Sequence, residues 1–341
     1  MFSIETVYLP TAEGLAAEQL NAIWNRYRLE ILPDDPPIPL DESLHGWRNI
    51  PEFVVANEFL LWNGAHITAA AVGEIEYYLT AENRHIASFD IYVPPENRGR
   101  GMAKLLLARL AAIAVEQGRT LMITRTNERI PAGQAFVERM GASHGMDLRI
   151  NQLRLSELDR EWLIRWCNPP TEGFTLGLWV GAYPEEQIDA IAALFNSFSD
   201  IPHGELAIDE QKQTPQQLRE MEKFRQARSV QHWTMYLQEE GSGRFAGLTE
   251  VMWNPHRPLI IEQGVTGVDP AFRKRGLGRW LKAAMIEKVL AEHPEVVFVR
   301  TSNANENAPM LKINTEMGFK PYQATTLWQI DTQKVVDYLS A

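Results

Sequence analysis

The hydrophobic and polar positions of this chain follow two periods, one typical of helices and one typical of strands. Apolar residues recur at helical spacing within 100–117 and again within 276–292. Shorter segments rich in β-branched and aromatic residues, such as 53–62 and 245–253, lie next to glycines that favour hairpins. The pattern therefore predicts runs of short strands that a few longer helices interrupt.

Each half of the chain is predicted to contain the same succession of elements, closing with a strand, a helix and two terminal strands. In the first half we expect strands at 4–9, 53–62, 66–78, 85–93 and 120–126 and helices at 11–30 and 100–117. In the second half we expect strands at 174–180, 231–238, 245–253, 259–268 and 296–301 and helices at 184–198 and 276–292. Such runs of strands predict an α+β fold with a mixed sheet, not a doubly wound one.

An internal repeat underlies this succession. Residues 91–103 (IYVPPENRGRGMA) are similar to 266–278 (TGVDPAFRKRGLG), so that Arg98 and Arg273 are 175 residues apart. At about the same spacing, the pair Met140-Gly141 corresponds to Met317-Gly318. Several elements that recur in the same order indicate a duplication.

A chain of 341 residues is long enough for two domains. We expect them at 1–168 and 169–341, with the seam at about 156–171. Ser156 is the expected N-cap of a helix through Trp166, which the Pro169-Pro170 pair ends.

Charge and composition narrow the class of protein. The net charge of −11 is spread over both halves, and no run of Lys and Arg offers a nucleic-acid site. The chain has no apolar stretch of membrane-spanning length and no N-terminal pattern of a signal peptide, so we expect a cytoplasmic location and no membrane partner. Cys167 is the only cysteine and is interpreted as a structural thiol. No group of His, Cys and Asp has the spacing of metal ligands, so we expect no metal.

The repeated turn has the chemistry of a pyrophosphate cradle. A strand ends, Arg-x-x-Gly-x-Ala or Arg-x-x-Gly-x-Gly follows, and a helix begins. Glycine lets the backbone approach a ligand, and the free amides of a helix start attract anions. The turn lacks the Gly-Lys-Ser/Thr of a Walker A loop, and by itself it is more typical of an ordinary loop before a helix.

In its context, the turn resembles that of the GNAT superfamily of N-acetyltransferases. The resemblance rests on residues 268–278 and on 301–319 (TSNANENAPMLKINTEMGF), and it extends to both copies. The second half is similar to the C-terminal domain of tandem GNAT proteins, the group that includes mycothiol synthase. The resemblance implies acetyl-CoA as co-substrate, held in the second copy by Val268, Arg273, Lys274, Arg275, Gly276, Leu277 and Gly278. In the first copy it implies Val93, Arg98, Gly99, Arg100, Gly101, Met102 and Ala103. Asn303 and Asn307 are either CoA contacts or helix caps.

The resemblance also implies catalytic positions. The family often uses a strand glutamate as base, and Glu262 lies at that position, whereas the first copy has Ala87 there. The family's usual acid is a tyrosine four residues before the glycine of Met-Gly, but those positions hold Val137 and Asn314. A tyrosine acid at that position is therefore excluded, while Asn314 remains a candidate hydrogen-bond donor to the thiol or to CoA.

In GNAT folds the loop between the first two helices borders the acceptor site. In the second half this loop contains His203 and Glu205, which are candidates for acceptor contacts, although a polar surface loop is the more ordinary interpretation. The sequence thus predicts an N-acetyltransferase acting on a small amine, with the chemistry mainly in the second half and the first half as scaffold. The alternatives are a non-catalytic module that binds acyl-CoA and a mycothiol-synthase-like acetyltransferase.

Overall fold

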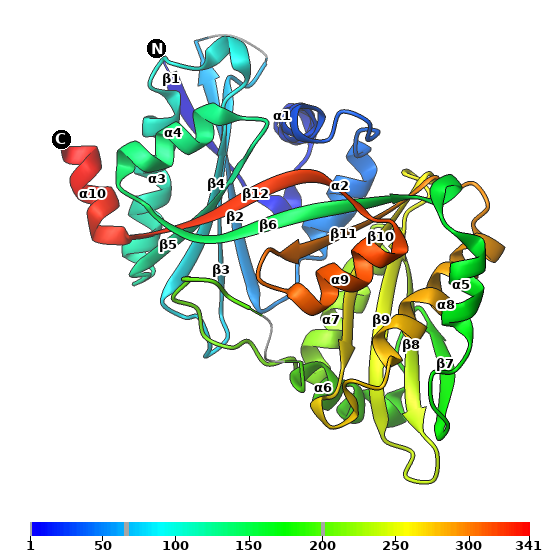
Figure 1. Cartoon of the computed structure of the whole chain (residues 1–341). Coiled ribbons are helices and arrows are strands. Elements are labelled where there is room, and N and C mark those ends of the chain that lie inside the picture. Colours follow the sequence, from blue (N-terminus) through cyan, green and yellow to red (C-terminus); the bar gives the residue numbers. More distant parts are fainter. Residues whose placement is uncertain (1, 65–67, 199–201) are drawn as a thin grey trace. The chain divides into compact units, whose positions relative to one another are not determined.

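The sequence repeat is a structural repeat in which each unit takes a strand and a helix from the other half of the chain. The computed structural model describes residues 2–64, 68–198 and 202–341 (Figure 1). Unit 1 consists of Met1–Asp147, His203–Gln211 and Ala324–Ala341, and unit 2 consists of Leu148–Pro202 and Lys212–Gln323. The compact units exchange segments, so they are not the two halves of the sequence. The predicted division into 1–168 and 169–341 therefore describes the two sequence repeats and stays a prediction.

Unit 1 is a mixed sheet with helices on it. Its strands follow the order β1 (Phe2–Val7), β2 (Val54–Asn63), β3 (Ala71–Tyr78), β4 (Ile86–Tyr92), β5 (Leu121–Asn127) and β12 (Lys320–Asp331). Its helices are α1 (Gly14–Ile31), α2 (Leu40–Arg48), α3 (Met102–Glu116), α4 (Pro131–Met140) and α10 (Thr332–Ser340). Only β4 and β5 pair in parallel, and the others described here pair antiparallel.

Unit 2 repeats this plan. Its strands follow the order β6 (Ser143–Arg154), β11 (Phe298–Ala304), β10 (Ile260–Val268), β9 (Phe245–Trp253), β8 (Gln231–Glu239) and β7 (Phe174–Val180). Its helices are α5 (Arg160–Cys167), α6 (Ile188–Asn196), α7 (Pro215–Ala227), α8 (Leu277–Glu292) and α9 (Ala308–Met317). The α+β fold with a mixed sheet that the sequence pattern predicts is confirmed.

The exchange is carried by the last strand of each repeat. β12 pairs with β5, with Thr325 opposite Asn127, and β6 pairs with β11, with Arg154 opposite Phe298. The helix that follows each strand goes with it, so that α10 packs on α3 and α5 packs on α8. The expectation of two terminal strands in each half is wrong, because each repeat ends in a single strand of 12 residues.

Two helices and one cap differ from the sequence expectation. α2 follows the proline-rich segment and packs Leu44 and Trp47 on the core of unit 1. α7 begins with a capping box at Thr214. The N-cap of α5 is Asp159 and not Ser156, because the Asp159 carboxylate accepts a hydrogen bond from the backbone amide of Trp162 at 2.9 Å.

The parallel pair of each unit leaves a gap that positions the functional site. β4 pairs with β5 only from Ile86 to Ser88, and β10 pairs with β11 only from Ile260 to Gln263. Beyond these residues, no further pairing of the two strands occurs in the described part of either unit. The ends of β4 and β10 then lead directly into the two glycine turns.

We predict that residues 1–168 do not fold cooperatively when expressed alone. The fragment lacks β12, so the hydrogen-bonding edge of β5 and the face of α3 under α10 are exposed. Adding a peptide of residues 318–341 is expected to restore a cooperative thermal transition. A fragment that melts as sharply without the peptide as with it contradicts the prediction, and a scrambled peptide of the same composition is the control.

Candidate functional site

The two glycine turns share one backbone conformation. Gly99 and Lys274 lie at the same place in the two turns with φ of 75° and 62°, and Gly101 and Gly276 follow as N-caps with φ of 80° and 79°. This left-handed region favours glycine, so Lys274 pays about 1 kcal/mol of strain. No side chain caps either helix, which leaves the first backbone amides of α3 and α8 available to a ligand.

The arginine of each turn braces the end of the preceding strand. Arg98 Nε donates to the backbone oxygen of Val93 at 3.0 Å, and Arg273 Nε donates to that of Val268 at 2.9 Å. The Arg98 guanidinium also binds the Glu30 carboxylate at 2.7 Å. These arginines therefore fix the conformation of the turns. In the first copy, the positive charge of Arg98 is already paired with the Glu30 carboxylate.

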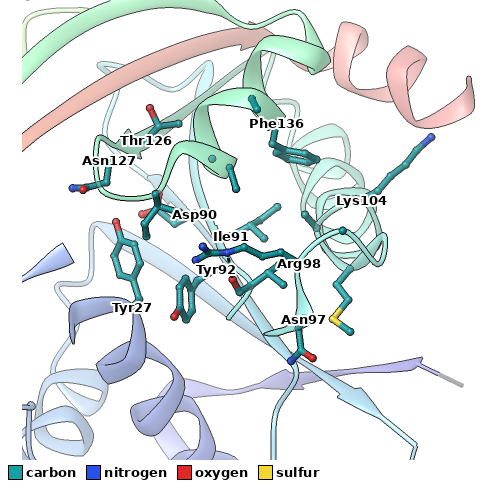
Figure 2. Close-up of a pocket in the computed structure, with 18 of the residues that line it drawn as sticks. Tyr27, Asp90, Ile91, Tyr92, Asn97, Arg98, Lys104, Thr126, Asn127 and Phe136 are labelled. Atoms are coloured by element: carbon teal, nitrogen blue, oxygen red, sulfur yellow. Dashed lines mark hydrogen bonds between the residues drawn. The ribbon is translucent and has the colours of Figure 1, made fainter. Parts of the chain in front are cut away.

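The first turn opens into a cavity of about 470 Å³ (Figure 2). A Cβ placed on Gly99 or Gly101 would meet no atom within 4 Å, so the turn is open. Gly99, Gly101, Met102 and Ala103 line the cavity together with Val93. Figure 2 shows Tyr27 and Asp90 on one side of the Arg98 guanidinium and Phe136 and Lys104 on the other. The cavity thus continues from the turn in two directions.

The second turn is partly covered. A Cβ on Gly276 would lie 3.0 Å from the side chain of Pro170. Pro170 follows α5 and therefore lies close over the turn. Arg279, in the first turn of α8, is bound to Glu316 at 2.9 Å and lies 4.9 Å from the Trp166 ring. The site around Gly276 is therefore narrower than the one around Gly101. Arg275, also predicted to bind CoA, lies over the ring of Phe272 at 5.7 Å.

A row of three carboxylates crosses the sheet of unit 1. Glu58 on β2 lies opposite Glu74 on β3, and Glu74 lies opposite Asp90 on β4. Glu58 accepts a hydrogen bond from Trp24 Nε1 at 3.0 Å, and Asp90 accepts one from Arg125 Nε at 2.8 Å. No donor among the described residues forms a hydrogen bond with Glu74. The row ends at Asp90, which lines the cavity.

Burial and mutual repulsion raise the pKa values along this row. Burial, followed by the charges of Asp90 and Glu76, raises the pKa of Glu74 to about 8. Burial and then the Glu74 charge raise the pKa of Glu58 well above its usual range. Burial also raises the pKa of Asp90, although Arg125 opposes this. With a single arginine beside it, the row does not carry all its charges at neutral pH unless a further cation is present.

The corresponding carboxylate of unit 2 is fully partnered. Glu250 on β9 holds the place in unit 2 that Glu74 on β3 holds in unit 1. Each lies the same number of residues along its strand from the residue that pairs with an equivalent position near the end of the neighbouring strand, β10 or β4, which leads into the glycine turn. Glu250 binds His232 Nε2 at 2.8 Å and accepts a hydrogen bond from the Tyr183 hydroxyl at 3.0 Å. Although burial opposes it, the bond with His232 holds the pKa of Glu250 below its usual value. This carboxylate already has hydrogen-bond partners inside the protein.

The predicted catalytic residues of the second half differ in their surroundings. Glu262 is exposed on β10, opposite Met252. Asn314 is buried, and its side-chain oxygen accepts a hydrogen bond from Lys282 Nζ at 2.6 Å. Its amide nitrogen donates to Asn303 Oδ1 at 2.7 Å, so the structure brings these two predicted residues together.

Lys282 is a buried amine that sequence reasoning did not single out. It is 1% exposed on α8, and desolvation by burial lowers its pKa to about 7. Lys282 and Asn314 stand at the positions that Leu107 and Val137 occupy in the first repeat. The second repeat therefore replaces an apolar contact by a polar pair.

The remaining predicted residues are placed as follows. Asn307 is the N-cap of α9 and accepts from the Met310 amide at 3.3 Å, which is the cap alternative. His203 and Glu205 lie in the segment that belongs to unit 1, where the Glu205 amide donates to the Gly145 carbonyl at 2.7 Å. Residues 199–201 of their loop lie outside the described residues. In the described part of the chain, no side-chain interaction links His203 or Glu205 to the glycine turns.

The described residues also bear on metal binding, membrane insertion and cysteine reactivity. No group of three or more His, Cys, Asp and Glu side chains there is placed to hold a metal ion. No helix there is long and apolar enough to cross a membrane. Burial raises the pKa of the Cys167 thiol to about 12, which is typical of a structural cysteine.

The carboxylate row is the part of the site that the sequence analysis missed. Glu74 and Glu76 alternate with apolar residues in the segment 71–78, which reads as the solvent face of a half-buried strand. Glu58 interrupts an otherwise mostly apolar strand in the same way. The signal was an acidic residue on each of three neighbouring strands, but only the register shows that these residues meet.

Comparisons with known proteins place this geometry among acyltransferases. The sequence pattern described as "Acetyltransferase (GNAT) family" matches residues 17–142 and 191–319. No curated protein sequence matches the chain.

Solved structures share the fold over the whole chain. A tandem GNAT protein from the clavulanic acid biosynthesis pathway is 22% identical, with a TM-score of 0.77 over 97% of this chain and 99% of that one. A GCN5-related N-acetyltransferase from Sphaerobacter thermophilus is 14% identical, with a TM-score of 0.67 over 96% of each chain. A GCN5-related glucosamine N-acetyltransferase region of a fungal multi-domain β-N-acetylglucosaminidase has a TM-score of 0.61 at 13% identity and covers 97% of this chain and 38% of that one. At these identities the likeness concerns the fold alone.

We predict that the buried amine of Lys282 makes stability depend on pH. Its pKa is about 7 in the folded state, and about 10.4 is usual for an unfolded chain, so the unfolded state binds more protons between these values. The free energy of unfolding should therefore rise from pH 7 to pH 10. Below pH 7 the amine is protonated in both states, and the full cost of burying its charge should lower the free energy of unfolding.

The double variant Lys282→Leu/Asn314→Val copies the first repeat and should remove this rise. At pH 6 it should stabilise the protein by on the order of 3 kcal/mol. Urea unfolding at pH 6, 7.5 and 9 measures the effect. An unchanged pH slope in the variant contradicts the assignment, and Lys334→Leu, an exposed lysine, is the control.

Proposed function

The chain belongs to the acetyltransferase (GNAT) family, and we propose that it transfers the acetyl group of acetyl-CoA to the nitrogen of a small cationic amine. We further propose that the reaction takes place in unit 1. The observation that carries this proposal is the row of Glu58, Glu74 and Asp90, which meets the same cavity as an open glycine turn.

The donor is supported by the turn itself. The amides at the start of α3 have no side-chain cap and line the cavity, and the positive end of the helix favours the pyrophosphate there. From the turn, the cavity follows β4 from Val93 toward Asp90, in the gap that opens where β4 and β5 part. An extended pantetheine arm along this path ends beside the carboxylate row.

The acceptor is supported by charge. The buried Glu58 and the half-buried Glu74 and Asp90, with Arg125 beside them, form a site that lacks positive charge, and an ammonium group supplies it. Tyr27 and Trp24 line the same end of the cavity and offer aromatic faces to a cation. A cationic amine therefore fits this end better than a neutral or an anionic acceptor does.

Glu74 is the proposed general base. The amine reaches the site as an ammonium ion and gives one proton to the Glu74 carboxylate, directly or through water. Its nitrogen then attacks the thioester carbonyl carbon, the C–S bond breaks, and an amide and the CoA thiolate form. The nitrogen gives its second proton to a water as the amide forms, and the thiolate takes a proton from that water, because the first repeat has Val137 where the family's usual acid stands. A base with a pKa near the working pH is efficient in this role.

A second arrangement keeps the chemistry in unit 2, as the sequence predicts. It uses Glu262 as base and Asn314 as hydrogen-bond donor, with unit 1 as scaffold. In its favour, the register between β10 and β9 shifts between Gln263 and Thr266, next to Glu262. Such an irregularity leaves backbone groups outside the hydrogen-bond pattern of the sheet, where they can bind a ligand. Against it, Asn314 is already engaged by Lys282 and Pro170 covers the turn.

Two further alternatives concern activity. In a non-catalytic module, acyl-CoA binds but no amine reacts. In a mycothiol-synthase-like enzyme, the acceptor is a cysteinyl compound. An acetylation assay with a panel of amines and detection of the released thiol separates these from the main proposal.

We predict that Glu74→Gln lowers kcat/KM by about 10²- to 10⁴-fold, the usual range for loss of a general base. In the wild type, kcat/KM should rise with pH up to about 8, because the carboxylate must lose its proton to act. The ratio of the wild-type kcat/KM to that of Glu74→Gln, measured with the same amine, should show this rise. Titration of the amine affects both enzymes equally and cancels in the ratio.

The matched control is Glu262→Gln, which removes the exposed strand glutamate of the other repeat. It should leave kcat/KM within about twofold of the wild type. If Glu262→Gln abolishes turnover while Glu74→Gln retains it, the reaction takes place in unit 2.

We also predict a preference for cationic acceptors. Among amines of similar size, one with a second positive charge should have a higher kcat/KM than its neutral analogue by at least about tenfold, because it satisfies more of the carboxylate row. Raising the salt concentration should reduce this advantage only slightly, since buried charges are poorly screened. Equal rates for the two amines contradict the charge argument.

A further inference from the structure

An ion pair crosses the gap between β4 and β5 in unit 1. Arg125 on β5 donates from Nε and Nη2 to the same carboxylate oxygen of Asp90 on β4, at 2.8 Å and 2.5 Å. The two residues stand just beyond Ser88 and Ile123, the last residues through which the two strands pair. The ion pair therefore spans the place where β4 and β5 have parted.

The cavity of unit 1 reaches this ion pair. Asp90 and Arg125 both line it, and Figure 2 shows Asp90 at the same end as Tyr27. The Arg125 side chain is 55% exposed, against 20% for that of Asp90. Asp90 occupies Nε and Nη2, whereas Nη1 of Arg125 forms no hydrogen bond with any described residue. A charged donor is thus fixed at this end of the cavity, with hydrogens left for a ligand.

Unit 2 differs at the same place. In the register of its parallel strands, Val265 and Asn303 stand where unit 1 has Asp90 and Arg125. Both are uncharged, and Asn303 Oδ1 accepts a hydrogen bond from the Asn314 amide. The guanidinium in the gap is therefore a property of unit 1 and does not follow from the shared fold.

The proposed reaction develops negative charge close to this guanidinium. In that reaction the pantetheine arm follows β4 to Asp90, which brings the thioester to the same end of the gap. When the amine nitrogen attacks, the π electrons of the carbonyl group move onto its oxygen. Donors that are held in place for such an oxygen usually make the largest single contribution to the rate.

We infer that Arg125 is a catalytic residue of unit 1, which donates from Nη1 to the carbonyl oxygen of the thioester and stabilises the negative charge that develops there. The inference rests on the proposed function. The C–N bond forms as the C–O π bond opens, and the π bond forms again as the C–S bond breaks and the thiolate leaves. Arg125 gives up no proton in either step, because a guanidinium stays protonated in proteins.

Arg125 also acts on the proposed base. Burial and the neighbouring acids raise the pKa of Glu74, and the Arg125 charge opposes them. A variant without the guanidinium therefore has a smaller fraction of ionised Glu74 at neutral pH. If Arg125 acted only through Glu74, a higher pH would restore the rate, whereas loss of a donor to the carbonyl oxygen persists at every pH.

The first test measures polarisation of the carbonyl group without turnover. The probe is the analogue of acetyl-CoA in which a methylene group replaces sulfur, with a heavy isotope at the carbonyl carbon. On the wild type, the infrared carbonyl band of the bound analogue should lie at lower frequency than in water. On Arg125→Ala it should return toward its frequency in water, because the donor is gone. A band at the same frequency on both proteins overturns the inference.

The second test is kinetic. Arg125→Ala should lower kcat by about 10²- to 10³-fold, the usual effect of losing one such donor, with the KM for acetyl-CoA within about threefold. Arg125→Lys, which keeps the charge but not the planar fork, should lose less. Added guanidinium ion should restore part of the rate of Arg125→Ala. A loss that disappears at pH 9 shows that Arg125 acts through Glu74 and overturns the inference.

Arg109→Ala is the matched control, since Arg109 is an exposed arginine of the same unit that does not line the cavity. It should match the wild type in band frequency and in kcat, and guanidinium ion should not raise its rate. Thermal unfolding without ligand identifies a variant that fails to fold, in which case Arg125→Gln replaces Arg125→Ala. If the wild type neither binds the analogue nor acetylates any amine, the proposed function fails instead.

Discussion

The pairing of β12 with β5 is the interaction on which the site in unit 1 depends. Without it, β5 has an open edge at the point where it parts from β4, and the gap that receives the pantetheine arm in our proposal has no fixed wall. The same pairing brings α10 onto α3, beside the glycine turn. The duplication is therefore not a simple tandem, because each repeat supplies the other unit with its last strand and helix.

Equal folds with unequal chemistry follow from a few side chains. In unit 1 the central carboxylate, Glu74, has no hydrogen-bond donor among the described residues and shares its face with two more acids. In unit 2 Glu250 is held by His232 and Tyr183. The first arrangement is short of positive charge and suits a cationic ligand, whereas the second is complete without one.

The sequence was sufficient for the parts of the structure that depend on local order. The strand-turn-helix of residues 91–117 and its copy follow from periodicity and glycine, and both were predicted within one or two residues at most boundaries. The exchange of strands was not, because pairing of residue 325 with 127 leaves no local signal. For the same reason, the sequence predicts a role for Glu262, which fits a motif, and not for Glu74, whose importance depends on cross-strand neighbours and burial.

The most direct test of the central claim is to block each turn with the same charge. Ala103→Glu and Gly278→Glu place a carboxylate at equivalent positions of the two cradles, and acetyl-CoA binding is then measured by calorimetry. The account predicts that Ala103→Glu abolishes binding and amine acetylation, whereas Gly278→Glu retains both. Loss of binding and turnover in Gly278→Glu, with both retained in Ala103→Glu, would contradict it.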